Sequence, residues 1–233
     1  MTMKTIGLLG GMSWESTVPY YQTINRTVAE QLGGLHSAKV LLYSVDFAEV
    51  EELQHAGRWD KAGALLADAA SRLEGAGADL LVICTNTMHK VAPAIEAKVR
   101  IPLLHIADPT AAAIRAAGHT TVGLLGTRFT MEQDFYKARL EKQHGLRVLV
   151  PGEASRADVH RIIYDELCQG VIRAESREIY QRIAGELLEA GAQCVILGCT
   201  EIGLLLKDGD VPAPLFDTTA LHAGAAALAA LGK

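Results

Sequence analysis

The chain of 233 residues lacks the features that mark several classes of protein. No apolar run approaches the roughly 18 residues that a membrane span needs, and the start, MTMKTIGLLGGMSWES, is too short in apolar residues for a signal peptide. The net charge is −5 and the basic residues are scattered, so no stripe for nucleic acid is visible. GLLGGMS matches neither GxGxxG nor GxxxxGK[ST], the loops of nucleotide-binding proteins. We expect a cytoplasmic protein that binds neither membrane nor nucleic acid.

Cysteine is also scarce, and its spacing fits neither a disulfide framework nor a metal centre. The four cysteines are Cys84, Cys168, Cys194 and Cys199, and no CxxC pair occurs. Without an export signal we expect free thiols. Cys84 and His89 together offer at most two ligands to zinc, so we predict no metal. A single cysteine beside an apolar strand is usually an inert core residue, and we assign Cys168 and Cys194 that role.

The pattern that is present is an alternation of strands and helices. Short runs rich in Val, Ile and Leu alternate with longer segments of helical period, which is typical of parallel sheets covered by helices. The apolar content of 49% is sufficient for a sizeable core. Strands are predicted near 5–10, 39–45, 79–84, 102–106, 121–126, 146–150, 193–198 and 213–217. Helices are predicted near 14–32, 59–76, 88–98, 108–117, 130–143, 156–169, 173–190 and 218–231.

Three segments of the chain recur in the same order at nearly constant offsets. TIGLLGG from Thr5 resembles TVGLLGT from Thr121, and GADLLVICTN from Gly77 resembles GAQCVILGCTE from Gly191. PLLHIAD, which begins at position 102, resembles PLFDTTA, which begins at position 214. We infer two copies of one βα-rich unit of about 110 residues.

In each copy a Cys-Thr pair follows a buried strand. Ligand sites of parallel sheets form at the carboxyl edge, where Cys84 and Cys199 are expected. If the two copies face each other about a pseudo-two-fold axis, both thiols point into one cleft from opposite sides. Inversion of a stereocentre needs a proton removed from one face of carbon and returned to the other, so a thiolate and a thiol suit this reaction.

The residues that follow the two cysteines can support the same chemistry. A helix N-terminus after each strand is expected to lower the pKa of the thiol. Backbone N–H groups and side chains can bind a substrate carboxylate and stabilise charge on the α-carbon. The candidates for this binding are Thr85, Asn86, Thr87 and Thr200.

VICTNTMH from Val82 and VILGCTEIGLL from Val195 resemble the two cysteine signatures of the aspartate/glutamate racemase family. GLLGGMSWEST resembles the subgroup of aspartate and broad-specificity amino-acid racemases. The resemblance implies an α/β fold of two similar domains related by pseudo-two-fold symmetry, each a mostly parallel four-stranded sheet flanked by helices. It further implies an active site in the interdomain cleft, no cofactor, neither pyridoxal phosphate nor metal, and a homodimer. In that family the last strand and helix return to the first domain, which predicts domains of 1–100 plus 212–233 and of 101–211.

The resemblance also assigns roles to residues. Cys84 and Cys199 are the catalytic acid and base, one for each enantiomer, and Thr85, Asn86 and Thr87 hold the α-carboxylate end. The rest of the predicted pocket consists of Met12, Ser13, Gln54, Thr127 and Thr200.

The chain departs from glutamate racemases at two places. Those enzymes carry an Asp-Ser near the first strand and a His after the second Cys-Thr, where this chain has Gly10-Gly11-Met12-Ser13 and Glu201. Glu201 either tunes Cys199 in place of that His or caps the following helix. The cation that binds a side-chain carboxylate in aspartate-specific members has no assured counterpart, and the candidates are His55, Arg58, Arg128 and Arg161.

Three hypotheses about function follow from these features. The first is racemisation of an acidic or other small amino acid. The second is another reaction on the same scaffold, such as hydantoin racemisation, cis–trans isomerisation of a diacid or decarboxylation of a malonate. The third is an inactive module that binds amino acids, although loss of a thiol would be expected there and both are present.

Overall fold

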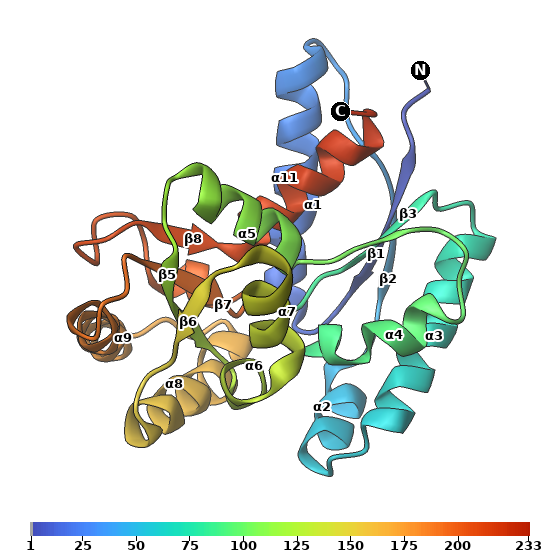
Figure 1. The fold of residues 1–233 in the computed structure, drawn as a ribbon. Helices are drawn as coiled ribbons and strands as arrows, with labels where there is room; N and C mark the ends of the chain where they lie inside the picture. The colour runs from blue at the N-terminus through green and yellow to red at the C-terminus, as the bar shows by residue number, and fades with distance from the viewer. Residues whose placement is uncertain (1) are drawn as a thin grey trace. The chain divides into compact units, whose positions relative to one another are not determined.

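Two four-stranded sheets, both parallel, organise residues 2–233 in the computed structural model (Figure 1). The first sheet has the order β2-β1-β3-β4, from strands β1 (Thr5–Gly10), β2 (Lys39–Ser44), β3 (Leu80–Ile83) and β4 (Leu103–Leu104). The second has the order β6-β5-β7-β8, from β5 (Thr121–Gly126), β6 (Arg147–Leu149), β7 (Cys194–Gly198) and β8 (Leu215–Asp217). The strand order is therefore the same in the two halves, which confirms the predicted α/β class and its repeat.

The chain divides into two units, and their boundaries differ from the predicted ones. Among residues 2–233, the first unit contains residues 2–105 and His222–Lys233, and the second contains Ile106–Leu221. The last strand, β8, pairs with β7, so it belongs to the second sheet rather than to the first domain. Only the helix that follows returns to the first unit. The internal repeat matches residues 214–217 to residues 102–105, which contain β4, and β8 has the same edge position in its sheet as β4 has in the first.

The helices follow the predicted segments with a few differences. Two short helices were not predicted, α2 (Phe47–His55) and α10 (Ile202–Leu205). The segment 88–98 is divided into a 3₁₀ helix, η1 (Thr87–Val91), and α4 (Ala92–Glu96), and the segment 130–143 into α6 (Arg128–Glu132) and α7 (Asp134–His144). The other helices are α1 (Trp14–Leu32), α3 (Trp59–Gly75), α5 (Ala107–Ala116), α8 (Glu153–Asp165), η2 (Leu167–Gln169), α9 (Ala174–Glu189) and α11 (Thr218–Ala230).

A polar side chain joins the first and third strands at equivalent places in the two units. The backbone N–H of Thr5 donates to Asp79 Oδ2 at 2.7 Å, and Asp79 N donates back to Thr5 O at 2.8 Å. In the second unit the N–H of Thr121 donates to Gln193 Oε1 at 3.0 Å, and Gln193 N donates to Thr121 O at 2.9 Å. These reciprocal pairs set the same register in both sheets.

Glycine allows neighbouring segments to approach a central strand of each sheet closely. A Cβ on Gly7 would lie 2.9 Å from Ala78 Cβ, and one on Gly123 would lie 2.9 Å from Leu187 Cδ1. These two glycines are matched by the sequence repeat. A side chain at either position would overlap neighbours that are already packed.

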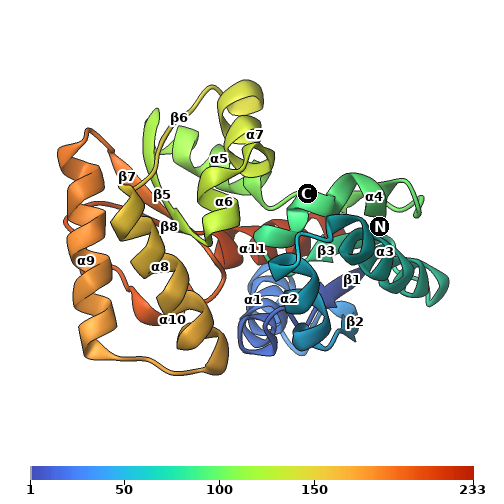
Figure 2. The same ribbon diagram turned by 90° about the horizontal axis from the view of Figure 1, so that it is seen from below.

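Helices cover both faces of the first sheet. On one face Ile6, Leu8 and Val82 pack with α1 and α11, and Cys84 belongs to this cluster. On the other face Leu9, Leu81 and Ile83 pack with α3, η1 and α4. Figures 1 and 2 show α1 beside α11, and α3 beside α4. Lys4 N donates to Ala230 O at 3.0 Å, so the end of α11 is held at the start of the first strand.

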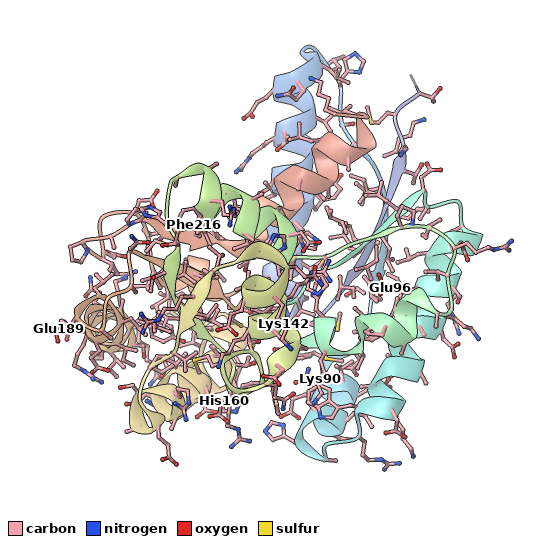
Figure 3. The ribbon with its side chains drawn as sticks, viewed as in Figure 1. Lys90, Glu96, Lys142, His160, Glu189 and Phe216 are labelled. Carbon is pink, nitrogen blue, oxygen red and sulfur yellow. The ribbon has the colours of Figure 1, made fainter. Side chains whose placement is uncertain are left out.

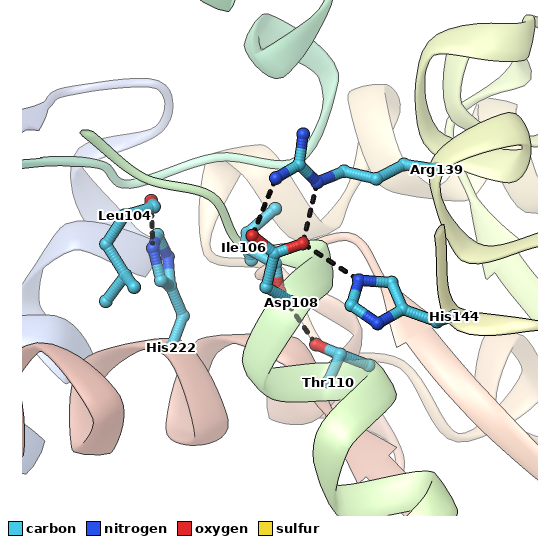
Figure 4. A network of polar contacts seen from close by, with 7 residues as sticks. All are labelled: Leu104, Ile106, Asp108, Thr110, Arg139, His144 and His222. Carbon is cyan, nitrogen blue, oxygen red and sulfur yellow. Dashed lines mark hydrogen bonds and ion pairs between the residues drawn. The ribbon is translucent and has the colours of Figure 1, made fainter. Parts of the chain in front are cut away.

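In the second unit an ion-pair network joins α5 to α7 (Figure 4). Arg139 Nε donates to Asp108 Oδ1 at 2.6 Å, and Arg139 Nη2 donates to Asp108 Oδ2 at 2.7 Å. His144 Nε2 lies 3.0 Å from Oδ1. Burial by itself raises the pKa of Asp108, but the hydrogen bonds and charges of Arg139 and His144 outweigh it and lower the pKa.

None of the helices in residues 2–233 combines the length and the apolar character that crossing a bilayer requires.

Candidate functional site

The two Cys-Thr pairs lie at the carboxyl ends of equivalent strands. Cys84 directly follows β3, and Cys199 directly follows β7; each of these strands lies second from one edge of its sheet. The N–H of Cys84 donates to Leu9 O at 2.9 Å, which continues the ladder of β1 and β3 by one residue. Both side chains are buried. Each thiol is therefore held by a central part of a rigid sheet.

The turn after Cys84 contains the three predicted carboxylate-binding residues, Thr85, Asn86 and Thr87, and all are buried. Thr85 N donates to Ile83 O at 2.9 Å, and His89 N donates to Asn86 O at 3.1 Å. The ring Nδ1 of His89 lies 2.8 Å from Thr85 O. The turn thus passes directly into η1.

Packing of η1 against α3 supports the same turn from outside. The Lys90 ammonium nitrogen lies 3.9 Å from the centre of the Trp59 ring, and Figure 3 labels Lys90 in this region. Burial lowers the pKa of Lys90. A cation over an indole face is a favourable contact, so Trp59 has a packing role, as expected.

The other predicted residues of the first unit are buried as well, namely Met12, Ser13 and Gln54. The loop after β1 is fastened to α1, because Gly11 N donates to Thr17 Oγ1 at 2.9 Å and Thr17 Oγ1 donates to Ser13 O at 2.8 Å. Gln54 comes from the unpredicted helix α2, and its Nε2 lies 2.9 Å from Met88 Sδ. Met88 is in η1, so α2 brings Gln54 to the helix that follows the Cys84 turn.

In the second unit Cys199, Thr200 and Glu201 form a buried group. Cys199 Sγ lies 3.0 Å from Glu201 Oε2, and the Thr200 hydroxyl donates to the same oxygen at 2.9 Å. The Glu201 side chain makes no capping hydrogen bond to α10. Thr127, the remaining predicted residue, is buried at the N-terminus of α6 and accepts from Thr130 N.

Cys168 is the member of this group that sequence reasoning missed. It lies in η2 and packs against the core of the second unit, and burial together with the nearby Glu201 carboxylate raises its pKa. The prediction of a purely inert core thiol therefore omitted this carboxylate. No signal in the sequence could have found it, because Cys168 lies 33 positions before Glu201 and outside both cysteine motifs.

The pKa values of both thiols move opposite to the expected direction. Burial raises the pKa of Cys84 and that of Cys199, and the negative charge of Glu201 raises the latter further. The predicted helix N-termini are weak, since η1 is a single 3₁₀ segment and α10 has four residues. Desolvation of the thiolate is the largest cause of the raised pKa at both positions.

The four candidate cations for a side-chain carboxylate are all exposed. His55 pairs with Glu51. Arg161 lies 3.7 Å from Asp158 and 3.8 Å from Glu166. The described contacts of these residues do not link them to either cysteine turn. Within residues 2–233, no cluster of three or more His, Cys, Asp or Glu side chains has the arrangement of a metal site.

Comparisons with known proteins agree with this geometry. The family model described as Asp/Glu/Hydantoin racemase matches residues 9–226. This chain belongs to that family. It is 57% identical to a candidate Asp/Glu racemase from Yersinia pestis, with a TM-score of 0.90 and coverage of 98% of this chain and 100% of the other. An aspartate racemase homologue from Pyrococcus horikoshii is 35% identical, with a TM-score of 0.83 and coverage of 98% and 100%. The broad-specificity amino-acid racemase RacX of Bacillus subtilis is 24% identical over 92% of this chain and 93% of its own.

Proposed function

We propose that this protein is an amino-acid racemase, an isomerase that interconverts L- and D-amino acids with Cys84 and Cys199 as acid and base and without a cofactor. One observation carries the proposal: a buried Cys-Thr pair follows the equivalent strand in each of two sheets of identical order. A reaction with one proton transfer on each face of a carbon needs two such groups. Membership of the racemase family and the names of its relatives support the same function.

The proposed reaction has two proton transfers. A thiolate on one face takes the α-proton and becomes a thiol, and the electron pair of the broken C–H bond stays on the α-carbon. The thiol on the other face then gives its proton to that carbon and becomes the thiolate. In the reverse direction the two cysteines exchange roles. The turn of Thr85, Asn86 and Thr87 is proposed to hold the α-carboxylate.

Glu201 is proposed to accept the proton of Cys199 before the reaction in one direction. The sulfur and the carboxylate oxygen are 3.0 Å apart, and both groups are buried. Transfer from thiol to carboxylate forms the thiolate without adding net charge to the buried group. This step offsets the raised pKa of Cys199, which by itself disfavours the reactive form.

The function is tested by incubation of the protein with single enantiomers of aspartate, glutamate, neutral amino acids and a substituted hydantoin, followed by chiral chromatography. We expect at least one amino acid to racemise. Cys84→Ser and Cys199→Ser are expected to lower the rate by ~10²-fold or more, the usual contribution of a positioned acid or base.

Cys194→Ala is the matched control, because Cys194 lies in β7 five residues before Cys199. Burial raises its pKa to about 11, and it has no assigned role. Activity close to that of the wild type is expected. A panel in which only the hydantoin reacts, or in which a serine variant keeps full activity, would contradict the proposal.

A further inference from the structure

Three buried histidines and a tyrosine form a cluster in the first unit. The ring centres of His89 and His105 are 4.4 Å apart, and those of His89 and His222 are 5.8 Å apart. The Tyr20 hydroxyl lies 2.9 Å from His222 Nδ1. All four side chains are at most 8% exposed. Tyr20 and Cys84 also belong to the same apolar cluster on this face of the sheet.

The cluster coincides with both points where the chain passes between its units. The first unit ends at His105, directly after β4, and resumes at His222 in α11. His89, which contacts both of these rings, is four residues after Thr85 and holds its carbonyl. The His89 side chain thus connects the turn after Cys84 with His105 and His222, where the chain leaves the first unit and re-enters it.

The hydrogen bonds fix which ring nitrogen carries a hydrogen. A backbone carbonyl only accepts, so His89 donates from Nδ1 to Thr85 O at 2.8 Å. For the same reason His222 donates from Nε2 to Leu104 O at 2.8 Å, as Figure 4 shows. In the neutral ring the Tyr20 hydroxyl donates to Nδ1 of His222. The two histidines therefore hold the carbonyls of Thr85 and Leu104 through opposite ring nitrogens.

We propose that His89 is a positioning residue, which together with His105 and His222 fixes the turn of Thr85, Asn86 and Thr87 relative to the two crossing points of the chain. The value of this positioning to catalysis rests on the proposed racemase function, because that turn is where the α-carboxylate is proposed to bind. Without the Nδ1 donor the Thr85 carbonyl loses its hydrogen bond, and the turn gains freedom at the cost of substrate binding.

The opposite use of ring nitrogens gives a crossed pair of variants. The Asn amide nitrogen lies near the position of His Nδ1, and that of Gln lies near Nε2, so Asn can replace the donor of His89 and Gln the donor of His222. His89→Asn and His222→Gln are the conservative variants. His89→Gln and His222→Asn keep a polar amide but place its nitrogen away from the carbonyl, so each of them removes the donor.

We expect His89→Gln to raise KM for the substrate by about tenfold while kcat changes less, and His89→Asn to restore most of the loss. A tenfold change corresponds to ~1.4 kcal/mol. At position 222 we expect the order to reverse, with Gln better than Asn. If the histidines only fill space, the size of the replacing side chain alone decides KM. Asn and Gln would then rank in the same order at both positions. That result would overturn the proposal.

Backbone hydrogen exchange of peptides that contain residues 84–91 tests the positioning without any activity. Faster exchange in His89→Gln than in His89→Asn supports the proposal, and equal exchange contradicts it. If the wild-type protein racemises nothing, the proposed function fails while this comparison still decides whether His89 holds the turn.

Discussion

At the residue scale, the two buried thiols lie in different surroundings. Cys84 is enclosed by apolar neighbours from the sheet and α1, whereas Cys199 contacts a carboxylate. Burial raises the pKa of both, but Glu201 adds its own charge only at Cys199. The two halves therefore share a strand order and differ in the groups that surround the thiol.

Replacement of Glu201 by Gln tests this difference. The change removes the negative charge beside Cys199, so we expect the pKa of Cys199 to fall toward that of an ordinary thiol, although burial keeps it raised. Thiolate absorbance against pH measures it, in a chain whose other three cysteines are alanine. A higher pKa in the Gln variant would show that the carboxylate does not raise it.

At the element scale, the strands were predicted more accurately than the short helices. A buried parallel strand is a continuous apolar run, and β1 and β5 were located to the residue. In α2 only Val50 and Gln54 are buried, so its period is weak, and the helix was missed. Gln54 was nevertheless named as a site residue through family resemblance.

The strand-end positions of the two cysteines were predictable, but the contacts of the residues around them were less so. The Cys-Thr repeat locates both thiols, because the motif and the strand end coincide in the sequence. The contact of Glu201 with Cys168 depends on packing of η2 near α10, which no local pattern encodes. The direction of the thiol pKa shifts was missed for a similar reason, since it follows from the depth of burial, which depends on the packing of the whole unit.

Close packing against β1 predicts a cost for a methyl group at Gly7. A Cβ there would lie 2.9 Å from Ala78 Cβ and 3.3 Å from the Leu80 carbonyl oxygen. We expect Gly7→Ala to lower the free energy of unfolding by ~1–3 kcal/mol in urea titrations.

Gly185→Ala is the control for that measurement. Gly185 lies inside α9, and nothing lies within 4 Å of an added Cβ. Alanine is expected to raise the free energy of unfolding by ~0.5–1 kcal/mol because it restricts the unfolded chain and favours helix. Equal effects at the two positions would contradict the proposed role of Gly7 in packing.

At the scale of the whole molecule, duplication explains why both sheets have one strand order. Asp79 pairs with Thr5, and Gln193 pairs with Thr121 at the equivalent place. A carboxylate and an amide thus join equivalent strands in the two sheets. The last strand, β8, pairs with β7 in the second sheet, as β4 pairs with β3 in the first. The homodimer and the shared cleft stay predictions.

The buried thiols predict a loss of stability in alkali. Below a pH of about 8.5, the ordinary thiol pKa, native and unfolded chains both hold these protons. Above it the unfolded chain releases them while the native Cys84 and Cys199, with raised pKa values, retain them. The free energy of unfolding should therefore fall by ~1.4 kcal/mol per pH unit for each such thiol.

Urea titrations between pH 7.5 and 10 measure that slope. Cys84→Ala should have a shallower slope than the wild-type protein, because one of the linked groups is removed. A free energy of unfolding that is constant or rises over this range would contradict the assignment of raised pKa values to the buried thiols.

Deuterium incorporation in the first turnovers tests the central claim, that two separate groups act on opposite faces of the α-carbon. A pure L-amino acid is converted in D₂O, and a sample is taken before much product has formed. The enantiomers are separated, and the mass of each is measured by mass spectrometry. Two thiols predict that the D-product carries one deuterium at the α-carbon while the remaining L-substrate carries none. Deuterium in both pools from the start, or a product that keeps the original proton, would contradict the account.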